Sequence, residues 1–382
     1  MPSRSNSPTA SHYDNPLNTN GHNYLHSYLD KPRAADAPKV SVVSTTHNQQ
    51  AYVRDTLDGF LAQRVDFPME VIVADDASTD ATPRIIQDYA DRHPNLFRPI
   101  LRSRNVGLNA NLTGALSAAR GEYIALCEGD DYWVDPLKLT KQVALLDEDP
   151  DTTVCFHPVQ VVWTHECAED EKLVHTLYRK FEEIFLPKFP PPFRAGDLSF
   201  ETLISRNFIQ TNSVMYRRLP RYDDIPADVM PLDWYLHVRH AAEGAIAMLP
   251  ETMAVYRRHP RGMWYKSITD PATFWRMQGP GHAATLDAML DVVSGDPVHE
   301  SIVAKNADWV LGAIAKQVPD PEGQQVLTQT TAKYPRIAAL ALRNRCTKTL
   351  GGRVKRLRRK LSRNATAPNS DAERRIDEPL SA

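Results

Sequence analysis

Short apolar runs alternate with amphipathic segments between residues 39 and 127. Four runs rich in β-branched or aliphatic side chains are typical of buried strands. They are Val40–Ser44, Glu70–Ala74, Pro99–Leu101 and Glu122–Cys127. Apolar residues at helical spacing predict helices between them. These run from about Ala51 to Arg64, from near Pro83, and from Ala110 to Ala119, the last with Gly121 as its C-cap. Such alternation predicts an α/β fold, a mainly parallel sheet with helices on both faces.

The pattern beyond residue 136 is less regular. It predicts helices over Lys138–Leu146 and Leu198–Arg206, and another that contains Asp233 and ends near Gly244. It predicts strands over Val154–Trp163, Gln210–Tyr216, Ala245–Leu249 and Met253–Tyr256. The charged, then proline-rich stretch Glu166–Arg194 is expected to be a mobile excursion. An alanine-rich helical pattern fills Pro271 to about Arg345.

Composition sets the domain boundaries. Residues 1–38 are polar and too poor in apolar side chains to offset the entropy of ordering, so we expect disorder. One α/β domain is expected over 39–265, with halves at 39–135 and 136–265. A helical extension over 266–345 and a basic, partly disordered tail over 346–382 follow.

Charge and cysteine usage exclude several classes of protein. The net charge of −2 gives no global electrostatic reason to bind nucleic acid. The four cysteines lack CxxC spacing, so they fit a reducing compartment better than a zinc site or a disulfide framework. No run of about 18 apolar residues and no secretory h-region are seen, so a cytoplasmic protein is expected.

Polar clusters follow three of the predicted strands, at Thr45–Asn48, Asp75–Asp76 and Glu128–Asp131. In open α/β sheets the ligand binds beyond the carboxyl ends of the strands, so the clusters should meet at one edge. The last cluster places three carboxylates, Glu128, Asp130 and Asp131, within four residues. They repel one another unless a cation lies among them, and oxygen ligands suit Mg²⁺ or Mn²⁺. Such a cation would call for an anionic partner, and a diphosphate is the commonest.

The order of four separate motifs carries a family resemblance. The motifs are Lys39–Asn48, Val73–Asp80, Gly121–Trp133, and Leu232-Asp233-Trp234 followed by Val255–His259 and Trp264. Together they resemble family 2 glycosyltransferases, in particular the bacterial subgroup with Asp-Trp and Tyr-Arg-x-His motifs. The resemblance covers about Lys39 to Trp264. It implies a GT-A fold, with a nucleotide-sugar-binding half over 39–135 and an acceptor half over 136–265.

The resemblance also implies a role for each matching residue. Asp233 would be the catalytic base, and Asp131 the principal metal ligand, with Asp130 near both ribose and metal. Thr45, His47 and Asp76 would line the nucleoside pocket, where Asp76 would accept a hydrogen bond from the base. Arg257 and His259 would face the diphosphate. The chain departs from the usual pattern at Glu128, where many relatives carry Asp, and at Leu232, where relatives often have Gly or Glu.

The implied reaction is transfer of a sugar, with inversion, from a nucleotide-diphosphate sugar to a hydroxyl group. UDP is preferred over other nucleotides only by the resemblance. The acceptor would be a glycan, a polymer or a lipid-linked sugar in cell-envelope or extracellular polysaccharide synthesis. Seven basic residues within Arg353–Arg363 form either a solvated tail helix or a peripheral contact with the inner face of the cell membrane.

Other interpretations remain beside this one. A nucleotidyltransferase that makes nucleotide sugars needs a glycine-rich, basic loop after its first strand, where this chain has Thr45–Asn48. A non-catalytic glycan- or nucleotide-binding module would be expected to lack the metal carboxylates or the base. Asp75 and Asp76 taken alone also fit a turn and helix cap, and Asp233 a first-turn carboxylate favoured by the helix dipole.

Overall fold

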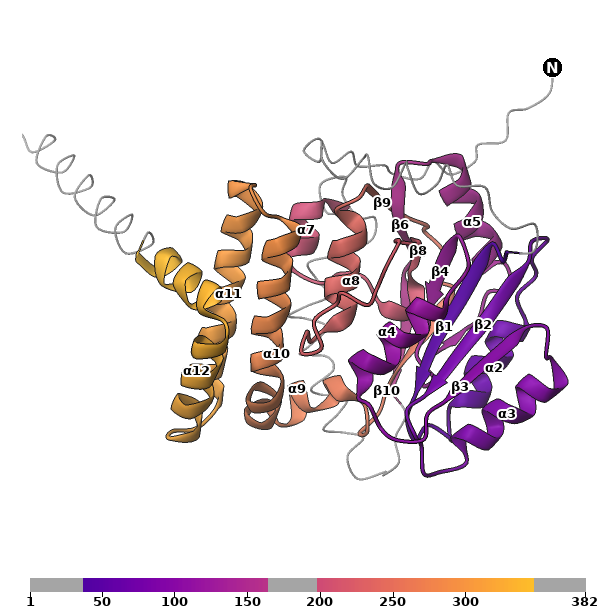
Figure 1. Ribbon diagram of the computed structural model, residues 1–382, viewed down its shortest axis with the longest axis horizontal. Helices are drawn as coiled ribbons and strands as arrows, with labels where there is room; N and C mark the ends of the chain where they lie inside the picture. Colours follow the sequence, from indigo (N-terminus) through magenta and orange to yellow (C-terminus); the bar gives the residue numbers. More distant parts are fainter. Residues whose placement is uncertain (1–36, 164–197, 347–382) are drawn as a thin grey trace, which may run out of the picture.

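A seven-stranded sheet forms the centre of the molecule (Figure 1). The computed structural model describes residues 37–163 and 198–346. The strand order is β3 (Phe97–Leu101), β2 (Met69–Asp75), β1 (Val40–Thr46), β4 (Tyr123–Leu126), β8 (Met215–Arg217), β6 (Thr152–Phe156) and β9 (Ala245–Met248). The first four strands run parallel, and β8 is antiparallel to both its neighbours. The sheet is therefore mixed but mainly parallel, and the predicted fold class is confirmed.

Helices cover both faces of this sheet, because successive strand residues point to opposite sides. Val40 and Val42 pack in the core with α2 (Val53–Leu61), α3 (Thr82–Arg92) and α5 (Lys138–Glu148). Val43 belongs to the other core, with α4 (Leu108–Ala118) and α8 (Leu232–Ala241). The register pairs Thr46 with Asp75 and Val43 with Leu126, so the carboxyl ends of the strands lie at one edge, as predicted.

A three-stranded sheet lies beside that edge, in the order β5 (Tyr132–Trp133), β10 (Ala254–Arg258) and β7 (Val159–Trp163). The single strand predicted over Val154–Trp163 is wrong. It consists of β6 and β7, which belong to different sheets, and they are separated at Pro158, which has no backbone N–H for a ladder.

Two further local predictions are corrected. Gln210–Tyr216 is not one strand: a 3₁₀ turn, η2 (Thr211–Ser213), precedes β8. Gly121 does not cap α4, which ends at Ala118 with an extended Ala119 after it. Gly121 is needed for close approach instead, because a Cβ there would lie 2.4 Å from the backbone nitrogen of Ser41.

The C-terminal extension is helical, as expected. Its main helices are α10 (Pro271–Val292), α11 (Pro297–Gln317) and α12 (Glu322–Lys333), preceded by the short η3 (Met263–Tyr265) and α9 (Lys266–Thr269) and followed by a helix over 335–346. They pack beside α7 (Phe200–Ser205) and α8, away from β1–β3 (Figure 1). None of the helices described is long and apolar enough to cross a membrane. The expectations for 1–36, for the whole excursion over 166–194, and for Arg353–Arg363 lie outside the described residues.

Candidate active site

The acidic loop after β4 is held by the ends of β1 and α2. The backbone N–H of Gly129 donates to the carbonyl oxygen of Thr45 at 3.0 Å. The buried hydroxyl of Thr56 lies 2.5 Å from the carbonyl oxygen of Asp131 and 3.0 Å from that of Gly129. A Cβ at Gly129 would lie 2.3 Å from Cγ2 of Thr46, so only glycine fits here. The loop is thus fixed against the strand edge where a ligand is expected.

Strand β10 brings two basic residues onto this loop. The backbone N–H of Arg257 donates to Oδ1 of Asp131 at 2.8 Å, and its guanidinium donates to the carbonyl oxygen of Asp130 at 2.9 Å. The same guanidinium pairs with Asp55 of α2. Nε2 of His259 lies 3.0 Å from Oδ2 of Asp130. Four residues expected at the site from two distant motifs therefore lie together: Asp130, Asp131, Arg257 and His259.

The expected base, Asp233, approaches from the other side of the site. It lies in the first turn of α8, and its Oδ2 accepts a hydrogen bond of 2.9 Å from Nδ2 of Asn207. The hydroxyl of Thr211 lies 3.5 Å from the same oxygen. The charge of Asp233 raises the pKa of Glu128, so these two carboxylates, 105 positions apart in the sequence (233 − 128), lie near one another.

The carboxylates at this edge carry more negative charge than their surroundings compensate. Burial, the charge of Asp130 and that of Asp233 raise the pKa of Glu128 to about 8. Burial and the charges of Asp130 and Glu128 raise the pKa of Asp131. Burial also raises the pKa of Asp233, although Trp234, Asn207 and Thr211 donate hydrogen bonds to its carboxylate. Carboxylates crowded in this way are stabilised by a bound cation.

The chemistry of this group fits a hard divalent cation, since its members offer only oxygen ligands. Within residues 37–163 and 198–346, however, no group of three or more His, Cys, Asp or Glu side chains is arranged as a metal site. Asp130 contacts His259, and Asp131 contacts the backbone of Arg257. The ligand set Glu128, Asp130 and Asp131 therefore stays a prediction.

The expected nucleoside end lies at β1 and β2. Both carboxylate oxygens of Asp76 accept backbone N–H groups, from Val106 at 2.7 Å and from Gly107 at 2.9 Å. His47 is exposed, and its Nδ1 lies 2.9 Å from the carbonyl oxygen of Asp76, while Thr45 is buried. Asp76 thus holds the turn before α4, whereas Asp75, whose Oδ2 accepts the backbone N–H of Ser78 at 2.9 Å, holds the local turn after β2. Its contact with a nucleotide base stays a prediction.

Four residues in contact with the site were not found from the sequence: Asp55, Thr56, Asn207 and Thr211. Each is a common polar residue without a motif, and each reaches the site through tertiary packing alone.

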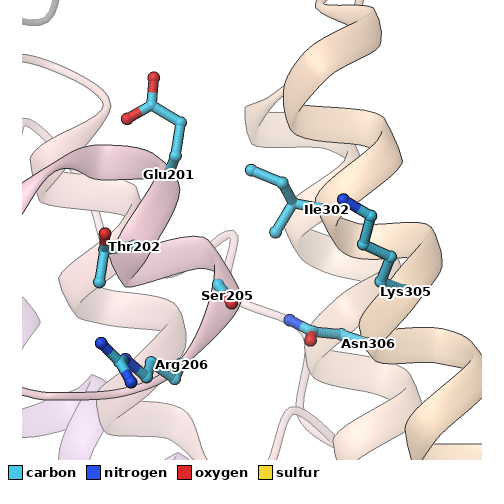
Figure 2. A pocket seen from close by; sticks show the side chains of 7 residues that line it. All are labelled: Glu201, Thr202, Ser205, Arg206, Ile302, Lys305 and Asn306. Atoms are coloured by element: carbon cyan, nitrogen blue, oxygen red, sulfur yellow. The ribbon is translucent and has the colours of Figure 1, made fainter. Parts of the chain in front are cut away.

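A separate hollow of about 290 Å³ lies between α7 and α11 (Figure 2). It is lined by Glu201, Thr202, Ser205, Arg206, Ile302, Lys305 and Asn306. None of the residues expected from the sequence at the active site lines it, and it is distinct from the acidic loop.

Comparisons with known proteins agree with this arrangement. The model of the family "Glycosyl transferase family 2" matches residues 41–200. An uncharacterised protein of Mycobacterium tuberculosis (strain H37Rv) is 56% identical over 317 residues, which cover 83% of this chain and 86% of that protein. EpsE of Bacillus subtilis (strain 168), named as a candidate glycosyltransferase, is 32% identical over 54% of this chain and 68% of EpsE.

Among solved structures, S. aureus TarS 1–349 in complex with UDP matches with a TM-score of 0.50 and 19% sequence identity. The match covers 79% of this chain and 83% of that one, and it shows a shared fold. The mainly parallel sheet, with acidic residues at its carboxyl edge, defines a GT-A type α/β protein. The chain belongs to glycosyl transferase family 2.

Proposed function

We propose that this glycosyltransferase moves a sugar, with inversion, from a UDP-sugar to a hydroxyl of a glycan, polymer or lipid-linked acceptor. Polysaccharide synthesis at the cell envelope is the proposed setting. The observation that carries the proposal is the meeting of two carboxylate groups from distant motifs. The acidic loop after β4 supplies Glu128, Asp130 and Asp131, and α8 supplies Asp233, whose charge raises the pKa of Glu128.

Inversion requires one base on the face of the sugar opposite the leaving group. In the proposed step, Asp233 accepts the proton of the acceptor hydroxyl as that oxygen forms a bond to the anomeric carbon. The bond from this carbon to the diphosphate breaks, and its electron pair leaves with the nucleoside diphosphate. No carboxylate nucleophile is needed, unlike in retaining hydrolysis. The raised pKa of Asp233 makes it a stronger base than an exposed aspartate once it has lost its proton.

The chain's own cation near the leaving group would be Arg257. The Arg257 side chain is 8% exposed, and Cζ of its guanidinium lies 4.2 Å from the centre of the Tyr132 ring. Its partner Asp55 is 58% exposed, so the guanidinium can exchange this contact for a phosphate oxygen at little cost. His259 lies against Tyr52, with ring centres 4.8 Å apart. We therefore expect both basic residues to contact the diphosphate.

Asp130, Asp131 and Glu128 are the residues that would hold a divalent cation such as Mn²⁺ or Mg²⁺. Such an ion would supply positive charge to the leaving diphosphate. Its binding would also neutralise the carboxylate group whose pKa values are raised. The fit rests on this uncompensated charge and on the oxygen-only ligand chemistry.

The direct test is Asp233→Asn, compared with Asp224→Asn. Asp224 pairs with Arg239 of the same helix, α8, so its variant controls for disturbance of that helix. Transfer should fall at least 1,000-fold in Asp233→Asn and stay within twofold of wild type in the control. Binding of UDP with Mn²⁺, measured by calorimetry, should change less than threefold in both. Retained transfer in Asp233→Asn would remove this residue from the role of base.

The donor class is tested separately by thermal shift with nucleotide sugars, each with and without Mn²⁺. A UDP-sugar is expected to raise the Tm most, and only when Mn²⁺ is present. A module that binds glycans without catalysis would show a shift but no transfer to any acceptor. The absence of a metal-dependent shift with every nucleotide sugar would contradict the proposed function.

A further inference from the structure

The segment over residues 226–231 leads directly into the helix that carries the expected base. Helix α8 begins at Leu232, and Asp233 lies in its first turn. Among the described residues, no side chain caps the N-terminus of α8 with a hydrogen bond, so the place of this turn depends on what holds the segment before it. Leu232 is buried in the core, which leaves the turn little freedom once the segment is fixed.

One side of this segment is held by α4, in the half of the domain expected to bind the nucleotide sugar. Nδ2 of Asn109, a buried residue, donates to the carbonyl oxygen of Ala227 at 2.9 Å and to that of Val229 at 2.5 Å. An amide nitrogen carries two protons, so Asn109 makes both hydrogen bonds at once. Asn109 closely follows Gly107, whose backbone N–H donates to Asp76. The segment is therefore connected to the turn before α4.

The other side of the segment is held by the C-terminal extension, whose helix α10 lies beside α8 (Figure 1). Oδ2 of Asp228 accepts a hydrogen bond from the hydroxyl of Tyr334, just after α12, and pairs with Nζ of Lys333 at 2.7 Å. The backbone N–H of Met230 donates to the carbonyl oxygen of Gly281 in α10 at 3.3 Å. A Cβ at Gly281 would lie 2.6 Å from Cβ of Met230, so the close approach of α10 needs glycine here.

The two sets of contacts alternate along the segment: α4 holds residues 227 and 229, and the extension holds residues 228 and 230. Loss of either set would leave the segment attached on one side only. We propose that Asn109, Asp228 and Tyr334 are positioning residues for Asp233, and that the C-terminal extension is thus part of the catalytic unit. This inference rests on the proposed function, in which Asp233 is the base.

The positioning residues act on the backbone of the base and not on its carboxylate, which Asn207 and Thr211 contact. A displacement of about 1 Å in a catalytic group can lower a rate ~100-fold, even when its cause is remote. The acidic loop expected to bind the diphosphate is held by β1, α2 and β10 instead. Loss of a positioning residue should therefore slow transfer without weakening donor binding, a separation that a general loss of structure would not produce.

The kinetic test begins at the contact between the extension and the segment. Tyr334→Phe removes only the hydroxyl and keeps the buried ring, and Asp228→Ala removes the acceptor. We expect kcat to fall roughly tenfold in each, while Kd for UDP with Mn²⁺ stays within threefold. Arg336→Gln is the matched control, because Arg336 ties the helix after α12 to Asp287 and Asp291 of α10. Its kcat should stay within twofold of wild type.

Combined variants test whether the contact itself matters. Tyr334→Phe with Asp228→Ala should have a kcat within threefold of Asp228→Ala alone, because both changes remove the same contact. Asp228→Glu keeps the carboxylate and should recover kcat to within threefold of wild type. Asn109→Ala removes the hold from α4 and should lower kcat by roughly tenfold to a hundredfold. Thr113→Ala, which loses a hydrogen bond inside α4, is its control and should stay within twofold.

Hydrogen exchange gives a readout that does not depend on activity. Amide exchange over residues 226–236 is measured without ligand. We expect it to be at least about threefold faster than wild type in Tyr334→Phe and in Asn109→Ala, because a less firmly held segment opens more often. Arg336→Gln should exchange like wild type. Tyr334→Phe keeps the proposal testable if Asn109→Ala does not fold.

Failure of this inference can be told apart from failure of the proposed function. If the wild type transfers a sugar but kcat in Tyr334→Phe and Asp228→Ala is unchanged, or exchange over 226–236 is unchanged, only the inference is overturned. An equal fall of kcat in Arg336→Gln, or a parallel loss of UDP binding, would show a general loss of structure and overturn it as well. If the wild type neither binds UDP with Mn²⁺ nor transfers a sugar, the proposed function fails, and a role in positioning a base fails with it.

Discussion

Two glutamates at opposite edges of the central sheet show how differently the same side chain can be used. Glu70 stands at the start of β2, and Glu128 directly follows β4. Burial raises the pKa of both carboxyl groups. In Glu70, hydrogen bonds from Ser41, Arg120 and Arg98 outweigh burial and hold the pKa below its usual range. In Glu128, the neighbouring carboxylates add to the effect of burial, and the pKa rises to about 8.

The contacts explain the contrast. Oε2 of Glu70 lies 2.5 Å from Nη1 of Arg98 and 2.9 Å from Nη2 of Arg120, and Oε1 accepts the hydroxyl of Ser41 at 2.7 Å. Glu70 therefore connects β1, β2, β3 and the segment before β4 at the amino edge of the parallel strands. Glu128 instead faces the charges of Asp130 and Asp233. A carboxylate that is fully satisfied stabilises the fold, whereas a group of unsatisfied carboxylates is suited to bind a ligand.

The largest effect should come from removing one charge of the acidic group. Asp131→Asn keeps the Oδ1 atom that accepts the backbone N–H of Arg257, so the loop should stay folded. The variant should lose transfer activity by at least 1,000-fold and bind UDP with Mn²⁺ at least 100-fold more weakly, because a principal anionic ligand of the cation is lost. Calorimetry with and without Mn²⁺ measures this. If Asp131→Asn binds UDP with Mn²⁺ as tightly as wild type, the acidic group is not the cation site, and its contrast with Glu70 would not reflect function.

The next effect concerns the amino edge and should appear in stability alone. Glu70→Ala removes a buried acceptor of four groups, Ser41, Arg98, and both the backbone and the side chain of Arg120. We expect a loss of ~3 kcal/mol in the free energy of unfolding, as is usual when one member of a buried ionic network is removed. Transfer activity per folded molecule should stay within twofold of wild type. Urea unfolding measures the loss, and Glu148→Ala, at an exposed position of α5, is the control.

More of the fold than of the site could be predicted from the sequence. β-branched runs and helical spacing are local signals, and they placed the four parallel strands and the helices on both faces. The strand predicted at Gln210–Tyr216 failed over its first half, because a 3₁₀ turn of three residues is too short to show a period of its own in the sequence. That turn carries Thr211, so its contact with Asp233 was missed as well. Asp55 and Asn207 were missed because only tertiary packing brings them to the site.

The individual acids show a similar limit. The family resemblance predicted one site that contains Asp130, Asp131, Arg257 and His259. The structure shows that these residues lie together. The sequence could not distinguish Asp76 as a ligand contact from Asp76 as the acceptor of the backbone of Val106 and Gly107, because both uses need a carboxylate after β2. It also gave no reason to separate Glu70 from Glu128. The two glutamates carry the same charge and both flank buried strands, so only their neighbours in space decide whether the pKa is raised or lowered.

The smallest effect should be the dependence of stability on pH, with opposite signs at the two edges. The raised pKa of Glu128 means that the folded protein binds more protons than the unfolded chain between about 4.5 and 8. The stability from Glu128 is therefore fully present below 4.5 and is lost as the pH rises through 8. For Glu70 the pKa is lowered, so its contribution is present above 4.5 and is lost as the pH falls through the folded value.

Glu128→Gln should remove the loss of stability that occurs as the pH rises through 8. In the absence of metal, the variant should be more stable than wild type at pH 8.5, by roughly 2 kcal/mol, and nearly equal to it at pH 5. Saturating UDP and Mn²⁺ should reverse the order, because the cation then stabilises the ionised glutamate and not the amide. Tm measured from pH 5 to 9, with and without UDP and Mn²⁺, tests both statements. A wild type whose Tm is flat between pH 5 and 8.5 would show that the charge of Glu128 is already compensated, and the contrast with Glu70 would be lost.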